Sequence, residues 1–213
     1  MRKVLVVVLF LCAACFAYAQ VMAGATPFSA DMSMNLKDGK NMNGKVYVGG
    51  GKMRQEFNTE GHEVIQIMDL QRKVTDMLMP QQKMYMEMAY GQMMQQHRGP
   101  KMPDLKSFDP NNPCAQSEEM TCEKVGTETV NGRATDKWIF KNKKTGDSQT
   151  LWIDKKIMYA IKMQSKDMEM NLTNVKEGMP DASLFQIPAG YRKFDMGGMM
   201  RGGQMPQAPD SNE

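Results

Sequence analysis

Apolar and polar residues alternate with a period of two along most of the chain. The segment 29–36 is the clearest case, since Ala30, Met32, Met34 and Leu36 are separated by polar residues. Successive side chains of a β-strand point to opposite sides, so this pattern predicts a half-buried strand. The same reasoning predicts strands at 44–48, 52–57, 64–69, 73–79, 83–88, 122–130, 134–142, 149–153, 157–165 and 168–175.

Turn residues separate these predicted strands. Asn131-Gly132 stands between two alternating segments and predicts a hairpin. Gly49-Gly50-Gly51 is expected to break or bulge the strand that begins at Gly44. Asp181 is expected to cap a short turn through Phe185. The chain is therefore predicted to be mainly β, with an antiparallel sheet.

Only one helical pattern is convincing in the first half of the chain. Tyr90, Met93, Met94 and His97 follow helical spacing, and Gly99-Pro100 ends the pattern. The fold is thus expected to contain one or two short helices beside the sheet.

The first 19 residues resemble a signal peptide. Arg2 and Lys3 are followed by the apolar run 4–14 and then by Ala17-Tyr18-Ala19. We expect cleavage before Gln20, and a lipid-modified Cys15 is the less favoured alternative. Export to the periplasm or the exterior follows, with a single domain over 20–194 and a disordered Gly- and Met-rich tail over 195–213.

Export changes the net charge of the mature chain and allows its cysteines to be oxidised. Losing Arg2 and Lys3 from 27 basic residues leaves 25 against 24 acidic ones, so nothing favours nucleic-acid binding. The two cysteines of the exported chain, Cys114 and Cys122, are expected to form a disulfide. Their spacing fits neither a CxxC redox motif nor a structural zinc site. The proline-rich segment 100–121 is interpreted as an irregular excursion that this bond fixes in place.

Methionine is the unusual component, with 25 residues. It is a weak strand former, so local propensity does not explain its place on alternating strand positions. Methionine is flexible and polarizable and adapts to variable apolar partners, although an ordinary core produces the same pattern. Tyr90, Met93 and Met94 are candidates for a lid over an apolar cavity. The residues predicted to line that cavity are Met32, Met34, Met77, Met79, Met84, Met86, Met88, Met168 and Met170.

Two other uses of methionine stay open. Thioethers bind Cu(I), and one candidate site combines Met93, Met94 and His97. A second, looser site in the tail contains Met196, Met199, Met200 and Met205. Methionines could also scavenge oxidants as sulfoxides.

Catalysis is not expected. The chain has two histidines, His62 and His97, and neither lies in a metal-ligand pattern. No nucleophile elbow, HExxH motif or phosphate-binding glycine loop is present, and no cofactor is expected.

Several segments in order resemble a known group of exported proteins. They are Phe28-Ser29-Ala30-Asp31-Met32, Gly44-Lys45-Val46-Tyr47, Lys52-Met53-Arg54-Gln55-Glu56, Ile67-Met68-Asp69-Leu70, Lys83-Met84-Tyr85-Met86-Glu87-Met88, Leu151-Trp152-Ile153-Asp154 and Leu184-Phe185-Gln186-Ile187-Pro188-Ala189-Gly190-Tyr191. The sequence is similar, over most of 26–194, to domain-of-unknown-function proteins related to the outer-membrane lipoprotein carrier and lipoprotein-sorting superfamily.

That resemblance implies a fold and a function. The implied fold is a curved, half-open antiparallel β-barrel wrapped around helices that serve as plug or lid. The implied function is non-catalytic binding of lipid or lipoprotein acyl chains in the cell envelope, near a membrane or a partner protein.

Overall fold

The computed structural model describes residues 26–59, 62–89, 114 and 117–194. The predicted signal peptide, the helical patch at 90–97 and the tail from 195 lie outside these residues. The described strands are β1 (Phe28–Leu36), β2 (Asn41–Gly49), β3 (Lys52–Thr59), β4 (His62–Asp69), β5 (Val74–Met79), β6 (Met84–Ala89), β7 (Met120–Val130), β8 (Arg133–Asn142), β9 (Ser148–Asp154), β10 (Tyr159–Ser165), β11 (Met168–Glu177) and β12 (Arg192–Lys193).

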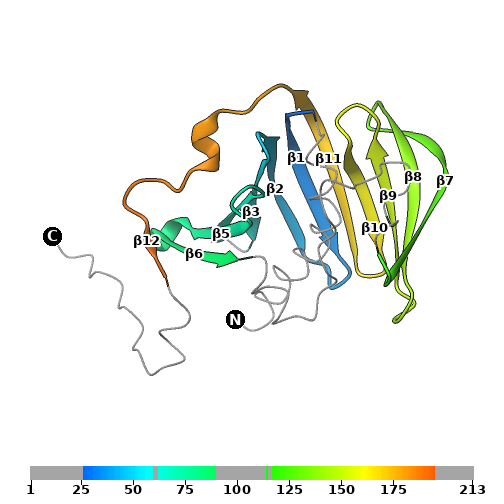
Figure 1. The fold of residues 1–213 in the computed structure, drawn as a ribbon, viewed down its shortest axis with the longest axis horizontal. Coiled ribbons are helices and arrows are strands. Elements are labelled where there is room, and N and C mark those ends of the chain that lie inside the picture. The colour runs from blue at the N-terminus through cyan, green and yellow to red at the C-terminus, as the bar shows by residue number, and fades with distance from the viewer. Residues whose placement is uncertain (1–25, 60–61, 90–113, 115–116, 195–213) are drawn as a thin grey trace.

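All twelve strands belong to one sheet, in the order β12-β6-β5-β4-β3-β2-β1-β11-β10-β9-β8-β7. Neighbours pair antiparallel except β12, which pairs parallel with β6. The first strand joins the two halves, because β1 lies between β2 and β11. Figure 1 shows β5 and β6 running at a steep angle to β8–β10, as expected for a strongly twisted sheet.

The sheet is strongly curved. From β3 to β10 there are four strand spacings, about 19 Å measured along the sheet. Nevertheless, the hydroxyl of Tyr159 in β10 donates a hydrogen bond to the sulfur of Met53 in β3 over 3.5 Å. The ring of Tyr159 also lies 5.2 Å from that of Phe28 in β1. These contacts require the face that carries Met53 and Phe28 to be concave, and they confirm the predicted curved antiparallel sheet.

The predicted hairpin at Asn131-Gly132 is confirmed. Both residues have positive φ, +50° and +76°, and Val130 pairs with Arg133 across the turn. The predicted break of the strand at Gly49-Gly50-Gly51 is confirmed, since β2 ends at Gly49 and β3 begins at Lys52, whereas the alternative of a bulge is wrong. Gly50 and Gly51, with φ of +60° and +72°, form a two-residue turn between separate strands β2 and β3. Two successive positive φ angles match the twist of a hairpin, so glycines there make a turn and not a bulge.

Two short 3₁₀ helices occur in the described residues. Pro80–Gln82 (η1) connects β5 to β6, and Ala182–Phe185 (η3) follows β11. The side chain of Asp181 accepts a hydrogen bond from the backbone N–H of Ser183 over 2.8 Å, so the predicted cap is confirmed.

The segment after β11 lies against the back of the sheet. Arg54 of β3 donates a hydrogen bond of 2.9 Å to the carbonyl of Leu184. Because Arg54 alternates with Met53, η3 lies on the side opposite the concave face. Figure 1 shows this segment leaving β11, forming η3 and descending to β12 beside β6.

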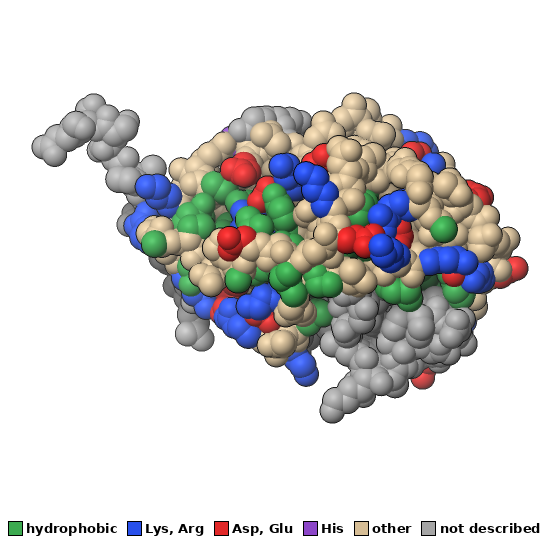
Figure 2. Space-filling view, turned by 90° about the horizontal axis from the view of Figure 1, so that it is seen from above, with side chains coloured by type: hydrophobic (Ala, Val, Ile, Leu, Met, Phe, Trp, Pro, Cys, Tyr) green, Lys and Arg blue, Asp and Glu red, His purple; other side chains and the backbone are tan. Residues whose placement is uncertain are grey.

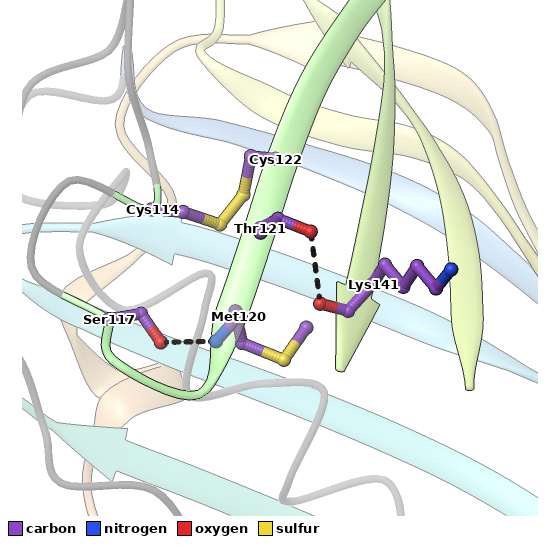
Figure 3. The surroundings of a disulfide bond; sticks show 6 residues. All are labelled: Cys114, Ser117, Met120, Thr121, Cys122 and Lys141. Atoms are coloured by element: carbon purple, nitrogen blue, oxygen red, sulfur yellow. Dashed lines mark hydrogen bonds between the residues drawn. A yellow bond between two sulfur atoms is a disulfide. The ribbon is translucent and has the colours of Figure 1, made fainter. Parts of the chain in front are cut away.

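The predicted disulfide between Cys114 and Cys122 is present, with Cα atoms 5.6 Å apart (Figure 3). Beside it, the Ser117 hydroxyl accepts a hydrogen bond from the backbone of Met120 over 3.0 Å. Both cysteines pack against the hydrophobic core of the concave face. A bond closing so short a loop contributes about 2–3 kcal/mol of stability and anchors the start of edge strand β7.

Candidate functional site

The strand register places all nine predicted methionines on the concave face. In β1 and β11, Met34 pairs with Met170, and Leu36 with Met168. At the other end of the sheet, Met77 pairs with Met86 and Met79 with Met84. Directly paired residues share a face, and the pairing is continuous from β6 to β11. We call this concave surface the methionine face.

Further methionines on this face were absent from the predicted set. Met42 pairs with Met34, Met53 with Met68, and Met163 with Met170. Each follows the same two-residue alternation as its neighbours, so the signal was present. Met42 precedes the predicted start of its strand at Gly44.

The methionine face has a core half and a half-exposed end. Met32, Met34 and Met170 are at most 5% exposed and belong to the main core cluster. Met168 and Met88 are half-buried and pack against that cluster. In β5 and β6, by contrast, four half-buried methionines belong to neither core cluster of the described residues. They are Met77, Met79, Met84 and Met86.

These four residues and Met88 form what we call the β5–β6 patch. Their cross-strand pairing brings thioethers directly opposite one another, with Cβ atoms about 5 Å apart. The patch is apolar and partly open to solvent, so its side chains are not fully used in packing this sheet. Flexible thioethers in this arrangement can adapt to an apolar guest of irregular shape.

The back of the patch is closed by packing. Ile65, Ile67 and Leu78 form a second, smaller core behind β4 and β5, with Tyr85 and Tyr191 packed against it. Tyr191 comes from the C-terminal segment, so that segment supplies the rear support. Figure 2 shows one face of the molecule, on which hydrophobic side chains gather over the half that contains β2–β6.

Charged groups lie on the back of β6. Glu87 alternates with Met86 and Met88, and it forms ion pairs of 2.6 Å with both Lys193 of β12 and Arg72. The hydrogen bond and charge of Lys193 lower the pKa of Glu87, against the opposing effect of burial. These contacts fix β12 to β6 and keep the charges off the methionine face.

Three polar residues interrupt the methionine face near the patch. Gln55 pairs with Gln66, and Thr75 lies between its two pairing partners, Met68 of β4 and Met88 of β6. All three are at most 4% exposed. Sequence reasoning missed them, because a polar residue in an alternating strand is ordinarily assigned to the solvent side.

Other predicted site residues lie outside the described part of the chain. They are Tyr90, Met93, Met94, His97, Met196, Met199, Met200 and Met205. Within the described part, no three His, Cys, Asp or Glu side chains are grouped so as to hold a metal ion. His62 lies at the surface beside Gln81, with 2.9 Å between Nδ1 and Oε1. The described helices include none with the length and apolar character needed to span a membrane.

No protein-family model and no curated protein matches the sequence. Solved structures do match. A crystal structure of an uncharacterized conserved protein from Thermus thermophilus superposes with a TM-score of 0.56 at 11% identity, covering 85% of this chain and 98% of that one. At this identity the likeness shows the fold.

Two further matches are more distant. The Pseudomonas aeruginosa MucA/MucB complex has a TM-score of 0.49 at 14% identity, covering 82% of this chain and 60% of the matched one. A LolA superfamily protein from Nitrosomonas europaea has a TM-score of 0.36 at 8% identity, covering 82% and 97%. The structural neighbours thus include the superfamily that the sequence motifs resemble.

Proposed function

We propose that this protein binds an apolar ligand, a lipid or a lipoprotein acyl chain, without catalysing a reaction. The ligand lies against the β5–β6 patch of the methionine face. One observation carries the proposal: four methionines of this patch are half-buried yet belong to neither core cluster. Methionines that only filled the core would be enclosed like Met34, which is 1% exposed.

The remaining features are consistent with a carrier or binding role. The patch is supported from behind by the C-terminal segment, so an apolar guest contacts a surface held in place. We propose that the protein works in the periplasm or outside the cell as a single domain over 20–194, after cleavage before Gln20. The apolar run 4–14 and Ala17-Tyr18-Ala19 support this location.

Cu(I) binding and oxidant scavenging stay as alternatives from the sequence. The residues nominated for copper lie outside the described part of the chain. A lipid ligand has the specific support of the β5–β6 patch, and we give it priority.

Native mass spectrometry of protein purified from its own compartment tests the proposal. We expect co-purifying lipid, observed as adduct masses that organic extraction removes. A uniformly empty mass under gentle ionisation would contradict lipid binding.

A variant pair locates the ligand. Met77→Gln with Met86→Gln adds two amides to the patch, whereas Thr173→Gln adds one to the opposite, exposed side of β11. The double variant replaces two apolar contacts with the ligand by polar amides. It is expected to bind the neutral fluorophore N-phenyl-1-naphthylamine about tenfold or more weakly than the unmodified protein. The Thr173 variant should bind as the unmodified protein does, and equal binding by all three proteins would place the ligand elsewhere.

A further inference from the structure

One buried hydroxyl on the methionine face is left unpaired by the described residues. Thr75 is 0% exposed, and its Oγ1 has no hydrogen-bond partner among the described residues. Buried hydroxyls are nearly always paired, because leaving one unpaired costs about 1–3 kcal/mol. The hydroxyl is therefore expected to serve an interaction that the described part of the chain does not supply.

The position of Thr75 limits what that interaction is. Thr75 pairs with Met68 on one side and with Met88 on the other, and it precedes Met77 by two residues on the same face. Met68 is 1% exposed and belongs to the core, whereas Met88 is half-buried. Thr75 thus marks the inner boundary of the β5–β6 patch, where the enclosed core begins.

A hydroxyl at this boundary suits a ligand with one polar group at the end of an apolar chain. The chain would lie over Met77, Met79, Met84 and Met86, and the polar group would reach the boundary. Met88 is unbranched, partly exposed and directly opposite Thr75, so a change of its rotamer is the movement by which a guest is expected to reach the hydroxyl. The buried side chains of Gln55 and Gln66 make the adjacent part of the face polar as well.

We infer that Thr75 donates a hydrogen bond to the carbonyl oxygen of an acyl ester or amide, and so selects acylated ligands over plain hydrocarbons. This inference rests on the proposed function and adds a ligand class to it. An uncharged carbonyl is favoured over a carboxylate. Among the residues of β3 to β6 that line up across the strands with Thr75, such as Met68 and Met88, and among those that line up with Met77, none is a Lys or Arg. A buried carboxylate without such a partner is strongly disfavoured.

Two probes of equal chain length test the selection. Methyl dodecanoate carries an ester carbonyl, and n-tetradecane has none. Each displaces N-phenyl-1-naphthylamine from the full-length protein, from Thr75→Val and from Thr75→Ser. Valine keeps the shape of threonine and removes the hydroxyl, whereas serine keeps the hydroxyl.

Thr75→Val is expected to bind methyl dodecanoate about three- to tenfold more weakly and n-tetradecane equally well, as the loss of one hydrogen bond implies. Thr75→Ser should retain the preference for the ester. The melting temperature of each variant serves as the check on folding, and Thr75→Val should melt no lower than the unmodified protein because an unpaired hydroxyl is removed.

The possible failures are distinguishable. If neither probe binds the unmodified protein, the proposed function fails. If both bind but Thr75→Val changes the two affinities in parallel, the carbonyl contact is wrong and the hydroxyl only meets water.

Discussion

The division of the methionine face into a core half and a half-exposed end, which we propose to bind the ligand, predicts different effects for one chemical change. Met34→Ala and Met86→Ala remove the same atoms from the same face. Met34 is 1% exposed in β1, paired with Met42 and Met170 inside the main core. Met86 is half-buried in β6 and belongs to neither core cluster of the described residues.

The expected losses of stability differ by several fold. Truncating an enclosed methionine to alanine leaves a cavity and costs about 2–5 kcal/mol. Met86 is already in contact with solvent, so its truncation should cost about 1 kcal/mol or less. With a urea m-value of about 2 kcal/mol/M, Met34→Ala should lower the unfolding midpoint by about 1–2.5 M and Met86→Ala by at most about 0.5 M.

Equilibrium urea unfolding measures this difference. Trp138 and Trp152 are both 5% exposed and provide the fluorescence signal. Binding of N-phenyl-1-naphthylamine to the same variants provides the second measurement, and here Met86→Ala should be the weaker binder. The division of the face is wrong if Met86→Ala loses as much stability as Met34→Ala and binds the fluorophore normally.

Three further changes test the structure away from the patch. Asp154→Asn should cost about 3 kcal/mol at pH 7 because it breaks the contact with Arg133. Burial raises the pKa of Asp154, but that contact and the backbone N–H groups of Ile157 and Lys156 outweigh it, so the pKa is lowered. The stabilisation is present above the unfolded pKa of about 4 and is lost as pH falls through the folded pKa, so urea midpoints of variant and parent should converge below pH 4. Asp76→Asn should instead stabilise the protein at pH 7. Burial, and after it the charge of Glu87, raises the pKa of Asp76, so the ionised carboxylate opposes folding as pH rises. Its variant should melt higher than the parent at pH 7 and gain nothing below pH 4, and a lower melting temperature at pH 7 would refute this. Gly44→Ala should lose at least about 1–3 kcal/mol in urea unfolding, since a Cβ there overlaps the backbone carbonyl of Glu56; an unchanged midpoint would show that β2 and β3 are spaced differently.

The local structure could be read from the sequence. Alternation in segments such as 29–36 located the strands and predicted which side of each is apolar. Asn131-Gly132 specified its hairpin, because few other residue pairs accept two positive φ angles. At Gly49-Gly50-Gly51 the sequence left a break and a bulge open, because alternation continues on both sides and does not reveal where the chain reverses.

The candidate site was only partly predictable. The nine methionines were assigned to one face from alternation alone, and the register agrees with that assignment. Alternation could not separate Met34, which is enclosed, from Met86, which is not. Nor could it show that Thr75 is buried among apolar neighbours.

By itself, then, the sequence determined the strands from β1 to β11, most turns, the disulfide and the apolar side of these strands, since these depend on residues near one another in the chain; the short parallel strand β12 was not predicted. Only the tertiary structure decided that β1 pairs with β11, that Tyr159 reaches Met53 across the curved face, and that the C-terminal segment packs behind β4–β6. These arrangements depend on distant segments meeting, and a two-residue period carries no information about which strand lies beside which. The exposure of the β5–β6 patch is a consequence of that arrangement, so the structure alone could locate it.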